Sequence, residues 1–185
     1  MKMTKEFLEG PHVMLDLETF GTKPGSVLRS IGAVRFTLQG GLLDEFYTNI
    51  DRASCEESGL AVDPDTERWW SQQSKEAQDG LLVDCRPLPE VVKSFSGWFN
   101  KSPQAYLWSQ GSNFDGPLWE AACVKVSLAP PWKFFNARDT RTAYDIGGLD
   151  PRSVPRAGTY HNALDDAKHQ ATCVIKALMG EASCV

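Results

Sequence analysis

The hydrophobic and polar positions of this chain follow the period of strands in its first third and the period of helices further on. Apolar runs with strand-like alternation predict β-strands at 12–21, 28–38 and 42–50. Turn clusters at 22–26 and 39–41 connect them. Because such short connections join antiparallel neighbours, we expect these three strands to form an antiparallel meander.

From residue 88 onward, helical patterns alternate with short strands. Apolar residues at helical spacing predict a helix at 88–100, followed by an apolar strand at 105–109 and a second helix at 115–125. A helix between two strands is typical of a crossover, so the strand at 105–109 is predicted to run parallel to a neighbour. The predicted fold class is α/β, with a mixed sheet of three antiparallel strands and then parallel ones, flanked by helices.

The remaining segments predict shorter elements and one long helix. Asp63 before Pro64 favours a helix start, and Ser74 favours another. We expect an apolar strand at 132–135 and a brief helix at 138–144. The last helix is predicted at 161–179, where small or apolar residues on one face allow close packing: Ala163, Ala167, Ala171, Val174 and Leu178.

The length of 185 residues suits one domain with a substantial core. We expect an N-terminal extension at 1–11, a single domain at 12–180 and a C-terminal tail at 181–185. No apolar run approaches membrane-spanning length, and the first ten residues lack a stretch of signal-peptide length. The sequence therefore predicts a cytoplasmic protein that makes no use of a membrane.

Charge and cysteine usage narrow the classes of function. The net charge of −5 argues against a protein that coats nucleic acid non-specifically. Residues 40–90 hold twelve acids and four bases, whereas 132–160 hold five bases and three acids, so a polyanion is expected to approach over 132–160. The alternative is an ordinary mixed surface. Five scattered cysteines without a C-x-x-C pair predict free thiols and no zinc site.

Two acids interrupt the apolar run of the first predicted strand. Asp16 and Glu18 are two residues apart, so an extended chain places both on one face. Two adjacent carboxylates repel each other and resist burial, and a cation between them removes both penalties. The hypothesis is a divalent metal site; the alternative is an edge strand whose acids face water.

Three more polar residues lie at expected element ends. Asp115 opens a predicted helix, where the alternative role is an N-cap. His161 and Asp166 are five residues apart, about 140° around a regular helix, which would place them on flanking sides of one helix start. Their alternative role is a capping box, with Asp165 and Asp166 favouring the helix dipole.

The ordered set Asp16-x-Glu18, Asp115 and His161-x₄-Asp166 resembles the DEDDh 3′→5′ exonucleases. The stretches 16–21, 111–115 and 161–167 are similar to the three motifs of that family. Trp69-Trp70 and 138–141 resemble a phage and bacterial subgroup that is labelled exoribonuclease or exodeoxyribonuclease VIII-like. The resemblance implies a ribonuclease H-like fold.

The resemblance also implies two-metal-ion hydrolysis that releases nucleoside 5′-monophosphates from the 3′ end of DNA or RNA. Asp16 would bridge two Mg²⁺ or Mn²⁺ ions about 4 Å apart. Glu18 and Asp166 would complete one ion, and Asp115 would hold the other largely through water. His161 would take the proton from the attacking water near neutral pH.

Substrate residues follow from the same resemblance. Thr19, Phe20 and Gly21 would hold the terminal nucleotide, with Phe20 stacking on the base; the alternative for Phe20 is a core aromatic. The motif spacing selects Asp166 rather than Asp165 as the last ligand.

Other notable side chains have more ordinary expectations. His12 and His169 are expected to be structural or exposed, because neither has the spacing that faces the acids. Phe114 is expected in the core. At least one residue of Trp69-Trp70 is expected to serve packing, since adjacent residues on a helix do not share a face.

Two competing functions are compatible with the same residues. One is a proofreading or trimming subunit of a complex, and another is a catalytically silent nucleic-acid-binding module on the same fold. The expected partner is a nucleic acid with a free 3′ end. A homodimer is compatible with the resemblance, because that family contains many dimers.

Overall fold

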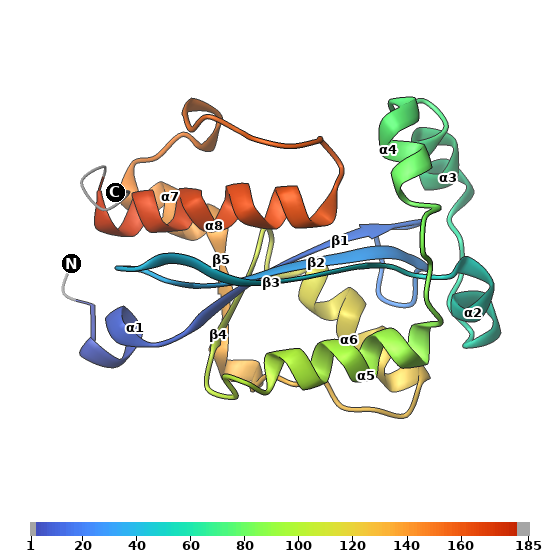
Figure 1. The fold of residues 1–185 in the computed structure, drawn as a ribbon, viewed down its shortest axis with the longest axis horizontal. Helices are drawn as coiled ribbons and strands as arrows, with labels where there is room; N and C mark the ends of the chain where they lie inside the picture. The colour runs from blue at the N-terminus through green and yellow to red at the C-terminus, as the bar shows by residue number, and fades with distance from the viewer. Residues whose placement is uncertain (1–2, 181–185) are drawn as a thin grey trace.

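A computed structural model describes residues 3–180, and a five-stranded mixed sheet lies at its centre (Figure 1). The strand order is β3-β2-β1-β4-β5. Antiparallel pairing joins β1 (His12–Thr19), β2 (Leu28–Thr37) and β3 (Gly41–Asn49). β4 (Tyr106–Ser109) runs parallel to β1, and β5 (Ala137–Asp139) runs parallel to β4. The predicted meander, the parallel strand after the crossover and the fold class are confirmed.

Helices cover both faces of this sheet (Figure 1). α5 (Leu88–Phe99) and α6 (Asp115–Lys125) lie on one face, and α7 (Thr140–Gly147) and α8 (Ala163–Met179) lie on the other. A separate buried apolar cluster fills each interface. Shorter helices complete the described chain: α1 (Lys5–Glu9), α2 (Arg52–Glu57), α3 (Pro64–Trp70), α4 (Lys75–Gly80), η1 (Phe134–Asn136) and η2 (Pro151–Ser153).

β1 divides its side chains between the two faces, as an extended strand must. Val13, Leu15 and Leu17 enter the cluster beneath α5 and α6, whereas Met14 enters the cluster beneath α7 and α8. Asp16 and Glu18 alternate in phase with Met14 and therefore belong to the α8 side. The strand thus carries its two acids toward the face that α8 covers.

α8 packs very closely on the sheet because both partners are small at the contact. Ala163, Ala167 and Ala171 are fully buried, which confirms the predicted close-packing face. At Gly32 of β2, an added Cβ would lie 2.1 Å from the carbonyl carbon of Ala163. Gly32 pairs with Asp16 in the β1–β2 ladder, so this contact sets the first turn of α8 directly over the acidic end of β1.

Side-chain caps explain where several helices begin. The carboxylate of Asp63 accepts from Asp65 N, with Pro64 in the first turn of α3, and the hydroxyl of Ser74 accepts from Ala77 N at α4. Both predicted helix starts are confirmed. Sequence reasoning missed α2, which the carboxylate of Asp51 caps at Ser54 N.

The strand predicted at 132–135 is wrong. Trp132 is buried, but Phe134 and Phe135 are 85% and 59% exposed in η1, and the edge strand is β5 at Ala137–Asp139. The brief helix predicted at 138–144 is shifted as well. The carboxylate of Asp139 accepts from Arg141 N and Thr142 N, so α7 begins only after this cap.

The chain ends and the thiols complete the description. α1 lies within the expected N-terminal extension, and Phe7 packs its ring against His12 and Tyr106. The expected tail at 181–185 and Cys184 lie outside the described residues; the other four cysteines are free thiols, as predicted. Across residues 3–180, every helix is too short or too polar to cross a bilayer.

We expect Gly32→Ala to lower the free energy of unfolding by roughly 2–4 kcal/mol, because the new methyl group must push α8 away from the sheet. Urea denaturation measures the change. Gly97→Ala is the matched control: Gly97 lies exposed inside α5 with open space around its Cβ position, so alanine there should be neutral or stabilise by about 0.5–1 kcal/mol. Equal effects of the two substitutions would contradict the close contact.

Candidate active site

The five residues selected from the sequence meet in one pocket of about 530 Å³. The pocket lies where the end of β1, the first turn of α6 and the first turns of α8 come together. Three separate segments of the chain contribute, and the five side chains all line it: Asp16, Glu18, Asp115, His161 and Asp166. The structure therefore brings together every residue that was predicted to be catalytic or to bind metal.

Asp16 and Glu18 are held on a strand that leaves them little freedom. Glu18 is 8% exposed, and Asp16 is partly buried. Gln170 of α8 donates from Nε2 to Oδ1 of Asp16 at 2.7 Å. The other amide atom of Gln170, Oε1, is buried without a protein partner among the described residues. Gln170 thus fixes the orientation of Asp16 from the opposite layer.

Asp115 opens α6 but does not cap it. Its Oδ1 accepts from the backbone N–H of Leu17 at 3.0 Å, which ties the first turn of α6 to β1 between the two strand acids. The side chain is 2% exposed. The alternative role as an N-cap is therefore replaced by a link across the pocket.

His161 lies outside α8, contrary to the expected helical spacing. Its backbone has φ of +62°, and Asn162 caps the helix by accepting from Leu164 N and Asp165 N. The approach of His161 to Asp166 results from this left-handed turn rather than from the 140° rotation on a helix. Ligand atoms of His161, Glu18 and Asp166 all lie within 4.8 Å of one another.

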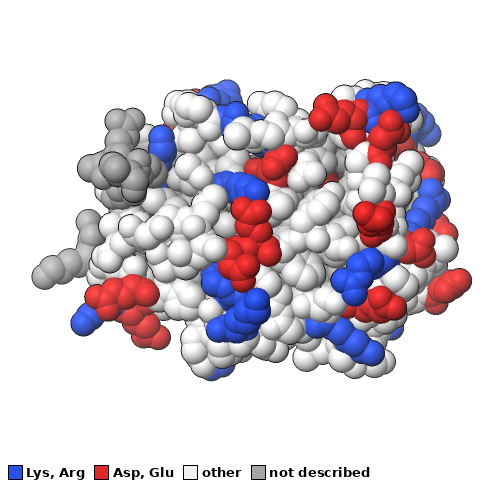
Figure 2. All heavy atoms as spheres, viewed as in Figure 1, with Lys and Arg blue, Asp and Glu red and all other residues white. Residues whose placement is uncertain are grey.

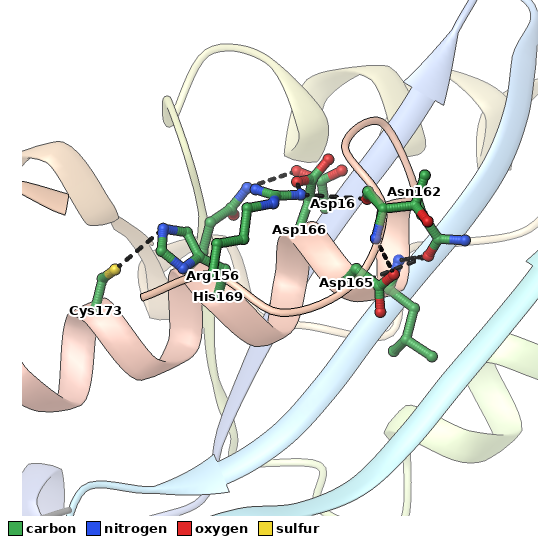
Figure 3. Close-up of polar contacts among 10 residues, drawn as sticks. Asp16, Arg156, Asn162, Asp165, Asp166, His169 and Cys173 are labelled. Carbon is green, nitrogen blue, oxygen red and sulfur yellow. Dashed lines mark hydrogen bonds and ion pairs between the residues drawn. The ribbon is translucent and has the colours of Figure 1, made fainter. Parts of the chain in front are cut away.

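Two neighbouring acids at the start of α8 have different partners (Figure 3). Asp166 forms an ion pair with Arg156 and lines the pocket. Asp165 accepts from the backbone N–H of Thr159 at 2.9 Å and does not line the pocket. The choice of Asp166 over Asp165 agrees with this geometry.

The three histidines play different parts. His12 is buried, with its ring nitrogens near Phe7 O at 2.9 Å and Trp108 Nε1 at 3.0 Å, so it is structural as expected. The expectation for His169 is wrong in one respect, because His169 lines the same pocket as the acids. It lies three residues after Asp166 on α8, and this i, i+3 spacing was the signal that could have placed it there.

Sequence reasoning also missed Arg156, Arg141 and Gln170, which line the pocket. Gln170 lies four residues after Asp166, so the same helical spacing could have identified it. The two arginines belong to the base-rich stretch 132–160, but nothing in their local sequence indicates that their side chains turn inward.

The residues predicted to bind substrate, Thr19, Phe20 and Gly21, are not among those that line the pocket. Thr19 donates to Gly21 O at 2.6 Å, and Phe20 is 7% exposed within the apolar core. The guanidinium of Arg29 lies 4.3 Å from the centre of the Phe20 ring. Their role toward a nucleotide stays a prediction, and base stacking on Phe20 would require its ring to move.

Aromatic side chains border the site. Trp70 is 3% exposed and donates to Thr19 O, which confirms that one residue of the pair serves packing. Trp69 is 42% exposed, and its ring lies edge-on to His161 with centroids 5.0 Å apart. Phe114 is partly buried against the core and also lines the pocket, so the expectation of a core residue holds only in part.

Burial and mutual repulsion raise the pKa values of three carboxyl groups. Burial, then Asp115 and Glu18, raise the pKa of Asp16 well above its ordinary value. Burial and the charge of Asp115 raise the pKa of Glu18 to about 8, and burial raises that of Asp115 to about 7. Burial and the charge of Arg156 lower the pKa of His161, which favours its neutral form.

These donors fit a hard divalent cation. Carboxylate oxygens are the ligands that Mg²⁺ and Mn²⁺ prefer, and a cation would relieve the repulsion that raises the pKa values. Glu18, Asp166 and His161 offer ligand atoms close enough to share one ion, with Asp16 and Asp115 in the same pocket. The arrangement can therefore collect cations at a place where an anionic substrate would otherwise be repelled.

The distribution of charge outside the pocket is mixed. In Figure 2, acidic side chains gather over the end formed by α2, α3 and α4, with basic side chains among them. Exposed ion pairs account for several of these: Arg52–Glu67, Arg68–Asp65 and Lys75–Asp79. Arg141 and Arg156 instead face the pocket, which supports an approach of a polyanion over 132–160.

Comparisons with known proteins agree with the geometry. The model of a family described as the 3′-5′ exoribonuclease Rv2179c-like domain matches residues 11–178. No curated protein sequence matches the chain.

Several solved structures share the fold at low sequence identity. The nuclease domain of 3′hExo, a DEDDh family member bound to rAMP, is 14% identical over 95% of this chain and 94% of that one, with a TM-score of 0.64. Escherichia coli exonuclease I in complex with a 5cy-dA13 oligonucleotide is 12% identical, with a TM-score of 0.63. It matches 91% of this chain, which spans only 40% of exonuclease I. Cell-death related nuclease 4 has a TM-score of 0.62 at 10% identity, over 94% of this chain and 65% of that one.

We expect the metal-free protein to lose stability as the pH rises from about 5 to about 8. A carboxyl group whose pKa is higher in the folded than in the unfolded state costs nothing below its unfolded value and destabilises the fold as the pH rises through the folded value. Glu18 has an ordinary value of 4.5 and a folded value of about 8, so it should contribute roughly 1 kcal/mol per pH unit in this window.

Urea denaturation in the presence of a chelator measures this dependence. Glu18→Gln should show a shallower loss of stability between pH 5.5 and pH 8 than the wild type. An identical pH dependence of the two proteins would contradict the assignment of the raised pKa to this carboxyl group.

Proposed function

Because this chain belongs to the family of 3′-5′ exoribonuclease Rv2179c-like domains, we propose that it releases nucleoside 5′-monophosphates one by one from the 3′ end of a nucleic acid. Membership confirms the resemblance to the DEDDh 3′-5′ exonucleases and makes the chain a 3′-5′ exonuclease. The observation that carries the finer proposal is the convergence of four acids and one histidine, from three segments, on a single pocket.

The proposed cofactor is a pair of divalent ions, Mg²⁺ or Mn²⁺, held by the four carboxylates. Asp16 would contact both, Glu18 and Asp166 would complete one site, and Asp115 would serve the other. Such ions supply a water of lowered pKa and stabilise the charge that develops on the leaving 3′ oxygen. Gln170 and the Leu17 N–H keep Asp16 and Asp115 in place by hydrogen bonds at 2.7 and 3.0 Å.

His161 is the proposed general base. Its ring is partly exposed at the pocket and lies beside Glu18 and Asp166, so it can take a proton from a water held there. The lowered pKa keeps the ring neutral, and thus able to accept, at neutral pH. Trp69 and Trp70 contact the ring edge-on and limit its rotation.

The substrate class is proposed as RNA or DNA with a free 3′ end. The family description names an exoribonuclease, so RNA is the first substrate to test. A competition assay with DNA and RNA of one sequence measures the preference, because only contacts to the 2′-hydroxyl separate the two. The alternative functions are a silent binding module and a subunit that is active only in a complex. An assay of cleavage by the isolated protein tests them.

End-labelled oligonucleotides with Mg²⁺ or Mn²⁺ should be shortened stepwise from the 3′ end, and excess EDTA should stop the reaction. Asp16→Ala should abolish both activity and metal binding, since it removes the central ligand. Asp65→Asn, an exposed residue of α3 far from the pocket residues in sequence, is the matched control and should retain full activity. Tight binding of uncut oligonucleotide by the wild type under every metal would favour a silent module.

His161→Ala should lower kcat by about 10²–10⁴ while the Kd for Mn²⁺ changes little, because a base acts on the proton rather than on the ion. Steady-state kinetics and calorimetric titration with Mn²⁺ measure the two quantities. A parallel loss of Mn²⁺ affinity and rate would instead assign His161 as a metal ligand, which its distance from Glu18 and Asp166 also allows.

A further inference from the structure

Arg156 is the one basic residue among the described ones that forms an ion pair with a proposed metal ligand. Its guanidinium contacts Asp166, and the side chains of both residues are 15% exposed. Figure 3 shows the side chain of Arg156 passing beside His169 toward the carboxylates of Asp166 and Asp16. By contrast, the Arg152 side chain, four residues earlier, is 89% exposed and pairs with Asp150 on the surface.

Neighbouring groups hold the Arg156 side chain in place but do not pair with all of its hydrogen-bond donors. The ring of Tyr160 lies 4.2 Å from the guanidinium carbon, a distance at which a cation–π contact forms. A terminal nitrogen also donates to Thr159 O at 3.4 Å. The Nε atom is buried and has no partner among the described residues, so one donor of the guanidinium is unsatisfied in this arrangement.

The position of this guanidinium conflicts with a bound metal ion. A divalent cation at Asp166 would weaken the ion pair with Arg156, because the two cations share one carboxylate and repel each other at contact distance. A guanidinium released from Asp166 but still held by Tyr160 would remain at the rim of the pocket. There it would face the anionic phosphate of a bound nucleotide, a group that its planar fork of donors fits well.

We propose that Arg156 is a positioning cation with two partners: it neutralises Asp166 in the metal-free enzyme and, once metal ions bind Asp166, moves to the phosphate of the 3′-terminal nucleotide. This inference rests on the proposed nuclease function. Arg156 thereby competes with the metal and assists the substrate. A residue that only supports the fold would not weaken metal binding and at the same time strengthen phosphate binding.

The first test measures metal affinity. Calorimetric titration of the metal-free protein with Mn²⁺ should give a Kd roughly tenfold lower for Arg156→Gln than for the wild type, because the competing cation is gone. Arg156→Lys keeps the charge and should bind Mn²⁺ with nearly wild-type affinity. Arg152→Gln is the matched control and should leave the Kd unchanged. An unchanged or weaker Mn²⁺ affinity of Arg156→Gln overturns the competition.

The second test measures recognition of phosphate at saturating Mn²⁺. Wild-type protein should bind uridine 5′-monophosphate more tightly than uridine, and this ratio of affinities should fall about tenfold in both Arg156→Gln and Arg156→Lys, since lysine lacks the planar fork. The kcat/KM for an oligonucleotide should fall with it by about 10–10². A ratio unchanged from wild type in both variants overturns the role toward substrate.

Failure of the proposed nuclease function can be distinguished from failure of the role proposed for Arg156. If wild-type protein releases no mononucleotide from any oligonucleotide, the proposed function fails, yet the Mn²⁺ titrations still report on the competition. If Arg156→Gln does not fold, as judged by its thermal transition, Arg156→Lys keeps the buried charge and still carries the phosphate test.

Discussion

The contact between Gly32 and the first turn of α8 is the constraint on which the rest of the site depends. Backbone meets backbone there, with no side chain between, so the helix start cannot slide along the sheet without a clash. Gly32 is paired with Asp16 across the ladder, and Asp166 lies in the same first turn of the helix. A single close approach therefore brings together acids that are about 150 residues apart in the chain.

Electrostatic repulsion opposes this assembly. Packing places ionisable carboxyl groups where water solvates them poorly, and the raised pKa values of Glu18 and Asp115 reflect this. Neutral hydrogen-bond donors from Gln170 and Leu17, and the charge of Arg156, offset part of it. Bound cations would relieve the repulsion that remains among these carboxylates.

The sequence predicted four of the five strands and most helices, because these depend on local patterns. The five predicted catalytic residues were selected together only by the resemblance of three ordered motifs to a known family. Alternation on β1 determined the face of Asp16 and Glu18, and the caps at Asp63 and Ser74 determined two helix starts. Prediction from the sequence failed where contacts between distant parts of the chain determine the local conformation. The edge strand was placed at 132–135, because apolar residues were assumed to be buried, and His161 was placed on a helix, although a left-handed turn delivers it.

Inward-pointing side chains from loops were the hardest to foresee. Arg156 belongs to an irregular segment without a period, so no spacing rule could direct it toward Asp166. His169 and Gln170 could have been found, since both follow Asp166 at helical intervals. The direction of a side chain can be predicted from the sequence only within a helix or a strand, where the spacing is regular.

The topology also places the parts of the pocket far apart along the chain. β1 ends at Thr19, whereas α8 spans Ala163–Met179, so most of the described chain separates the two elements. Until that helix docks, the early strand presents two acids without the histidine and the fourth carboxylate that complete the pocket. The complete set of pocket side chains therefore assembles only when a helix from one end of the described chain packs on a strand from the other end.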